Sequence, residues 1–294
     1  MRVNTVMIFS QSVNNVMRHY ENFFDLNESV SSGKKVNRPS DDPVDMGKIL
    51  GYRTVGDAIK QYERNLNNGI ALLNNTESSL ANAEEIVMNA KVLAEQMATG
   101  TYTADQREML SEQVENYIDD LIILGNTRIS GRAIFSGYKT DTQTFTRDEY
   151  YNVSYHGDNH KINFEISEST YVAVNTTGQE AFMDGTNVFD VLRDLRNALQ
   201  DNHQHGVQRA LEQLNESMQQ VIQERASVGT SLAQMNSAKM TLVDFAFQTE
   251  TLLSETEDTD MIDALTRLEQ SGIAFEATLK STAMITNLNL VNYV

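Results

Sequence analysis

The 294-residue chain contains no cysteine and no tryptophan, and it has only two prolines. This scarcity, together with abundant Gln, Asn, Ser, Thr and Ala, is typical of a protein built from long helices. No apolar run approaches the roughly 20 residues that a bilayer span requires. The N-terminus lacks a signal-peptide pattern, which indicates either a cytosolic protein or export by a signal-independent machine. The absence of cysteine suits an export route that threads unfolded chains, because no disulfide could trap the chain.

The charge is strongly acidic, with 41 acidic against 23 basic residues and a formal net charge of -18. A surface of this sign argues against nucleic acid as a partner, because phosphates require Lys and Arg. The C-terminal stretch from Ala277 to Val294 departs from this pattern, since Lys280 is its sole charged side chain. Solvated tails are usually charged and poor in aliphatic residues. The weakly charged end therefore indicates a segment that packs against a partner.

Two long stripes of apolar residues at 3-4 spacing dominate the pattern. The first runs from Pro43 to about Thr99, and the second runs from Val207 to Leu242. Each predicts a long helix of a coiled coil or bundle. Asp42 is expected to cap the first helix, with Pro43 at its first position. Because the stripes lie on either side of a different segment, they can bury themselves only against each other.

Shorter signals fill the chain between and beyond these stripes. A capping-box pattern from Thr103 to Gln106 predicts the start of a helix that ends at Gly125-Asn126. Alternating apolar residues between about Ser136 and Asp184 predict three to five short antiparallel strands. Shorter helical patterns occur in the first forty residues and after Asp260. Neither end can bury its apolar face alone, so we expect both to order when partners supply the missing surface.

Together these patterns predict a mainly α fold, an elongated rod of long antiparallel coiled-coil or bundle helices from both chain halves. A small antiparallel β domain is inserted in the middle. We expect three domains. Residues 1–40 and 255–294 form a terminal helical domain, residues 41–135 and 186–254 form the long bundle, and residues 136–185 form the β insertion.

Several short motifs resemble the flagellin family. They are the Ser31, Ser32 and Gly33 turn, the helix restart at Asp41, Asp42 and Pro43, and the Asn-rich stretch from Asn65 to Ile70, which contains Asn68 and Gly69. The opening residues, the segment containing Gly131, Phe135 and Gly137, and the ending from Thr286 to Val294 resemble the family's hook–filament junction subunits more than its filament subunits. Ala133 departs from the pattern, because an aromatic residue is common there.

The resemblance implies a structural subunit of the bacterial flagellum that acts as an adaptor at the hook–filament junction. Its N- and C-terminal helices would pair in an inner tube of a helical homo-oligomer, after type III export without a cleaved signal peptide. Implied partners are other copies of the chain, a neighbouring hook-associated protein, flagellin, and an export chaperone at the C-terminal helix. The implied place is extracellular, at the junction, without nucleic acid or membrane contacts. We expect assembly contacts from the C-terminal residues Leu265, Phe275, Leu279, Leu288 and Tyr293.

The sequence gives little support for a catalytic or metal-binding site. Asp41 and Asp42 could form a carboxylate pair, but no nucleophile or His base accompanies them, so helix capping is the simpler interpretation. The acids between Glu255 and Asp263 lack the glycine and terminal Glu of a calcium loop, and a solvated corner with an N-cap accounts for them better. Neither the His203/His205 pair nor the His156/His160 pair has helical i, i+4 geometry with an acidic third ligand nearby, so ordinary surface polar residues are a simpler interpretation than a zinc site. We therefore expect no catalytic, cofactor or metal residues.

Three alternative functions remain open at this point. A bulk flagellin of the filament would share every large-scale feature and differ mainly in copy number. A tip or translocator protein of a virulence type III secretion system would also be helical, acidic and free of cysteine, although it would not require the Ser-Ser-Gly and Asp-Asp-Pro motifs. An enzyme ranks last, because no nucleophile elbow, P-loop or dinucleotide fingerprint is present.

Overall fold

The computed structural model describes residues 2–99 and 102–291, and the side chains of residues 6–99 and 102–285. The chain divides into two compact units. Unit 1 contains residues 1–58 and 244–294, and unit 2 contains residues 59–243. Unit 1 therefore combines segments from the two ends of the chain, whereas unit 2 is one continuous segment.

Helices account for most of the described residues, as the sequence predicts. In chain order they are α1 Arg2–Ser32, α2 Pro43–Met97, α3 Ala104–Gly125, α4 Gly178–Phe182, α5 Val188–Gln200, α6 Gln204–Glu257 and α7 Met261–Val291. The two longest, α2 and α6, contribute residues to both units. The mainly α class is confirmed, and the two apolar stripes of the sequence fall on α2 and α6.

The predicted helix starts are confirmed by their hydrogen bonds. Oδ1 of Asp42 accepts from the backbone N–H groups of Val44 and Asp45, each at 2.9 Å, before α2. Thr103 and Gln106 form a complete capping box before α3. These side chains satisfy N–H groups that a helix cannot pair internally.

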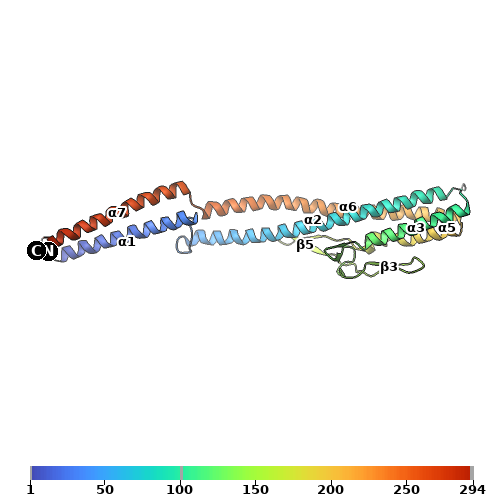
Figure 1. The fold of residues 1–294 in the computed structure, drawn as a ribbon, viewed down its shortest axis with the longest axis horizontal. Helices are drawn as coiled ribbons and strands as arrows, with labels where there is room; N and C mark the ends of the chain where they lie inside the picture. Colours follow the sequence, from blue (N-terminus) through green and yellow to red (C-terminus); the bar gives the residue numbers. More distant parts are fainter. Residues whose placement is uncertain (1, 100–101, 292–294) are drawn as a thin grey trace. The chain divides into compact units, whose positions relative to one another are not determined.

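Unit 2 is built on the antiparallel packing of α2 against α6. Alternate turns of each helix supply fully or nearly fully buried side chains, among them Leu66, Leu73 and Leu80 of α2 and Leu214, Val221 and Met235 of α6. Helices α3 and α5 run beside this pair (Figure 1) and add their own buried residues. At roughly 1.5 to 3 kcal/mol for each buried aliphatic side chain, this seam is the main source of stability in the unit.

The expected β insertion consists of three separate antiparallel pairs within unit 2. The strands are β1 Arg128–Ile129, β2 Arg132–Ala133, β3 Phe145–Arg147, β4 Val153–Tyr155, β5 Asn163–Ser167 and β6 Thr170–Ala173. They pair β1–β2, β3–β4 and β5–β6. The β1–β2 hairpin begins before residue 136, outside the expected range. Each of its strands has two residues, too few to produce a visible alternation.

A cluster of aromatic rings anchors the hairpins to the helices. Phe145 of β3 lies 5.9 Å from Phe182 of α4 and 5.1 Å from Phe189 of α5 between ring centroids. Phe135 packs edge-on against Phe182 at 5.5 Å. All four rings are fully buried. The hairpins therefore share a core with α4 and α5 and do not form a core of their own.

Unit 1 contains α1 and α7, which run antiparallel and side by side (Figure 1), with the adjoining ends of α2 and α6. Residues 41–58 and 244–254, which we expected in the long bundle, cluster with the terminal helices in this division. The three-domain organisation stays a prediction. Among the described residues, none of the helices is long and apolar enough to cross a membrane.

Candidate assembly interface

The two terminal helices contact each other through aromatic side chains. The Phe275 ring of α7 lies 5.8 Å from the Tyr20 ring and 6.3 Å from the Phe23 ring of α1, measured between centroids. Gly272 is close by, since a Cβ built there would lie 3.4 Å from Cε2 of Phe23. Phe275 was expected to make assembly contacts, and in the single chain it already holds the two helices together.

Much apolar surface on these helices stays uncovered in the single chain. Exposed large apolar side chains on α1 include Val6, Met7, Ile8, Phe9, Met17 and Phe24, and those on α7 include Ile262, Leu265, Ile273, Leu279 and Met284. Ile262 is 80% exposed and Val6 is 68% exposed. Many exposed large apolar side chains on one pair of helices indicate an interaction site in a protein that folds in water. The pair thus presents a surface suited to further helices.

Among the expected C-terminal residues, Leu265 and Leu279 are 50% and 43% exposed, as an assembly role requires. Leu288 lies within α7, but its side chain is outside the described set, and Tyr293 lies outside the described residues altogether. Their roles stay predictions.

The Ser31, Ser32 and Gly33 motif forms the end of α1. Gly33 has a φ of 74°, in the left-handed region that favours glycine at a helix C-terminus. Its N–H donates to the carbonyl of Ser29 at 2.9 Å, and Oγ of Ser32 accepts from Lys34 N at 3.2 Å. The motif is therefore a helix stop.

Asp41 organises the loop that follows. Its Oδ2 accepts from the backbone N–H groups of Arg38 at 2.8 Å and Asn37 at 3.0 Å. These two backbone hydrogen bonds lower the pKa of Asp41, since they favour the carboxylate. Asp41 and Asp42 thus hold backbone groups in a loop and a helix start. This arrangement supports the capping interpretation over an acid–base pair.

The remaining motif residues lie in unit 2 and serve packing and turns. Gly69 is buried, and a Cβ there would lie 2.5 Å from Cε of Met235, whereas Asn68 is exposed. Gly131 has a φ of 81° in the two-residue turn of the β1–β2 hairpin. Phe135 belongs to the aromatic cluster. Gly137 has a φ of 67° and leaves no room for a side chain beside Asp158.

One expectation about the acidic corner is wrong. Glu257 is only 4% exposed, and its carboxylate contacts both Lys34 and Arg53, the latter at 2.6 Å. A buried carboxylate is stabilised by such pairing, which a sequence reading of nearby acids cannot show because the cations come from the other end of the chain. Asp260 does cap α7, since its Oδ1 accepts from Ile262 N at 2.9 Å.

The described side chains hold no group of three or more His, Asp or Glu placed to bind a metal ion. The His203 and His205 rings lie 6.4 Å apart before and at the start of α6. His160 stacks on Tyr138 at 4.8 Å. These contacts are those of surface polar residues.

Comparison with known proteins identifies the type of chain. The family model described as the bacterial flagellin N-terminal helical region matches residues 3–140. The chain thus carries a flagellin-like N-terminal region. Flagellar hook-associated protein 3 of Escherichia coli is 25% identical to it over 99% of this chain and 98% of the relative. A flagellar filament 33 kDa core protein of Treponema phagedenis is 24% identical over 89% of this chain and 87% of the relative.

A solved structure shares the fold of this flagellin-like chain. The crystal structure of flagellar hook-associated protein 3 from Legionella pneumophila superposes with a TM-score of 0.65 at 15% sequence identity. The match covers 70% of this chain and 98% of that one. The two chains thus share a fold over this part.

Proposed function

We propose that this flagellin-like chain is a structural subunit of the bacterial flagellum and acts as an adaptor at the hook–filament junction. The observation that carries the proposal is similarity to hook-associated protein 3 over nearly the whole length of both chains. The bare apolar faces of α1 and α7 support it, because an adaptor must bind subunits on two sides. The chain acts by occupying a lattice position, so it needs no catalytic site.

In this role the subunits form a helical homo-oligomer, with α1 and α7 of each copy packed against those of its neighbours. One end of this homo-oligomer contacts a neighbouring hook-associated protein, and the other end contacts flagellin. The chain reaches this extracellular place by type III export without a cleaved signal peptide. A flagellar export chaperone holds the C-terminal helix beforehand, where the exposed Leu279 and Met284 offer an apolar surface.

A second candidate function is that of a bulk filament subunit. It is favoured by the matched flagellin N-terminal region and by the similarity to a filament core protein. The two functions differ in abundance, because a junction needs few copies and a filament needs many. Quantitative mass spectrometry of sheared filaments, using a labelled peptide of this chain as the standard, distinguishes them.

Deleting the gene tests the proposal. We expect hooks without filaments in electron micrographs, and flagellin released into the medium as monomer. Restoring the gene on a plasmid should restore filaments, which controls for effects on neighbouring genes. Normal filaments in the deletion strain would contradict the junction role, and loss of flagellin secretion would indicate an earlier role in export.

A further inference from the structure

The two chain reversals of unit 1 are hydrogen-bonded to each other. Lys35 N donates to the carbonyl of Glu257 at 2.8 Å, and Thr259 N donates to the carbonyl of Gly33 at 2.9 Å. Lys34 and Asp258 form an antiparallel bridge between these bonds. The connection from α1 to α2 is thus joined to the connection from α6 to α7 by a minimal two-stranded ladder.

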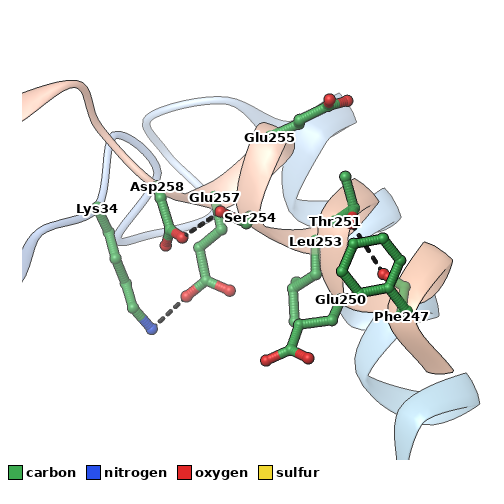
Figure 2. Close-up of a pocket in the computed structure, with 9 residues that line it drawn as sticks. All are labelled: Lys34, Phe247, Glu250, Thr251, Leu253, Ser254, Glu255, Glu257 and Asp258. Carbon is green, nitrogen blue, oxygen red and sulfur yellow. Dashed lines mark hydrogen bonds and ion pairs between the residues drawn. The ribbon is translucent and has the colours of Figure 1, made fainter. Parts of the chain in front are cut away.

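A buried carboxylate with two partly exposed cations lies over this ladder. The Glu257 carboxylate receives Nζ of Lys34 from the first connection and Nη2 of Arg53 from α2, the latter at 2.6 Å. Figure 2 shows the Lys34 side chain extending toward Glu257, and Ser254 hydrogen-bonded to Asp258 one turn before it. We call this set the clasp, defined as Gly33, Lys34, Lys35, Arg53, Glu257, Asp258 and Thr259.

The clasp fixes the inner ends of both terminal helices. Helix α1 ends at Ser32, directly before Gly33, and α7 begins at Met261, two residues after Thr259. The first turn is the costly step in forming a helix, so a helix whose end is already held forms more readily. Farther out, the contacts of Phe275 with Tyr20 and Phe23 act on helices that the clasp has already aligned.

We propose that the clasp couples the ordering of α1 to that of α7, so that the two terminal helices form and melt together. This device goes beyond the junction role, because it concerns how each chain prepares its ends. Without it, a partner that ordered one terminal helix would leave the other helix unaligned. With it, ordering either helix on a partner presents both as one surface.

Glu257→Gln tests the coupling while keeping the size of the side chain. The variant removes the charge that attracts the partly exposed Lys34 and Arg53, and it leaves a neutral amide in the buried place of the carboxylate, so the clasp should open. We expect amide hydrogen exchange, measured by mass spectrometry on the full chain, to accelerate at least tenfold in residues 24–32 and also in residues 261–270. The matched control is Glu250→Gln, an exposed carboxylate on the same helix, which should leave both segments unchanged.

Several outcomes would overturn the proposal. Acceleration confined to one of the two segments would show that the helices melt independently. No acceleration, or exchange at the unprotected rate in both segments of the unmodified chain, would show that the clasp does not hold them. Exchange in residues 66–80 serves as an internal reference, because it should stay slow if unit 2 is folded.

A second variant guards against a general effect of Glu257→Gln. Lys34→Met removes one cation but keeps the pair between Arg53 and Glu257. Lys34→Met should accelerate amide exchange in both segments. In the double variant Lys34→Met/Glu257→Gln, the acceleration should be smaller than the product of the accelerations in the two single variants, because both substitutions break the same contact between Lys34 and Glu257. A double variant whose acceleration equals that product would contradict a shared clasp.

Discussion

Arg225 of α6 donates from Nη2 to Oε1 of Glu77 of α2 at 2.5 Å. Its Nη1 reaches Glu84, one heptad along the same helix. Both hydrogen bonds raise the pKa of Arg225. Arg225 therefore occupies a position of the apolar α6 stripe and reaches two carboxylates of the facing helix. Both ion pairs can form in only one register of α2 along α6.

Replacing Arg225 tests this alignment. Arg225→Met should change the free energy of unfolding by no more than about 1 kcal/mol, because the pair is about one-third exposed and Met packs well in an apolar stripe. Arg225→Glu should destabilise unit 2 clearly more, since it places a third negative charge beside Glu77 and Glu84. Urea unfolding followed by circular dichroism measures both. Equal effects would argue against an electrostatic role.

Gly137 and Gly131 form a matched pair for testing close packing. Both have positive φ, but a Cβ at Gly137 would lie 2.4 Å from the carbonyl oxygen of Asp158, whereas nothing lies within 4 Å at Gly131. Gly131→Ala should cost about 1 kcal/mol, from backbone strain alone. Gly137→Ala should cost at least about 1 kcal/mol more, because the backbone must shift as well. Thermal unfolding of the two variants gives the comparison, and equal losses would contradict the packing argument.

Tyr155 should make the stability of unit 2 sensitive to alkaline pH. Burial raises the pKa of Tyr155 to about 12, with a smaller contribution from the charge of Asp158. Its hydroxyl donates toward the carbonyl oxygens of Phe135 at 3.0 Å and Asp158 at 2.9 Å. The unfolded chain loses this proton near the ordinary pKa of about 10, so between pH 10 and 12 the folded state binds more protons.

The contribution of Tyr155 is therefore complete below about pH 10 and lost as the pH rises toward 12. The free energy of unfolding, measured with urea, should be lower at pH 11 than at pH 9. The decrease should be smaller in the Tyr155→Phe variant. Tyr155→Phe should also be less stable at pH 9, because two carbonyls lose a donor. An identical pH dependence in both chains would assign the effect to other groups.

Leu279 provides the test of the terminal surface. Leu279→Asp should reduce motility of a complemented deletion strain to the level of the deletion, because a charge would be buried in any contact that covers this face. The control is Ser281→Asp, which adds the same charge to an exposed polar position two residues away. Circular dichroism of both purified chains should match the unmodified protein. Motile cells with Leu279→Asp would contradict an assembly role for this side chain.

The seams and caps could be predicted because their signals are local. The spacing of Leu66, Leu73 and Leu80 places them on one face of a helix, and Thr103 with Gln106 carries both halves of a capping box. All of these residues lie as predicted. The β1–β2 hairpin was missed because two-residue strands leave no periodicity, although its turn contains Gly131.

The clasp could not be predicted for a different reason. Glu257 resembles its acidic neighbours in sequence, and its burial depends on Lys34 and Arg53, which lie at the other end of the chain. Local patterns carry no information on such pairs. In the same way, the sequence identifies Phe275 as an apolar residue of a terminal helix, but not that Tyr20 and Phe23 would cover it within one chain.

The contact between Gly69 and Met235 makes the oxidation of Met235 a measure of how often α2 and α6 separate. Met235 is fully buried with its thioether where a Gly69 side chain would lie, whereas Met240, on the same helix, is 72% exposed. A chain without cysteine directs mild peroxide to methionine, and oxidant reaches Met235 only when α2 and α6 separate. The ratio of sulfoxide at these two positions therefore measures how often the helices part. Since a sulfoxide has no room beside Gly69, each such oxidation would also keep them apart.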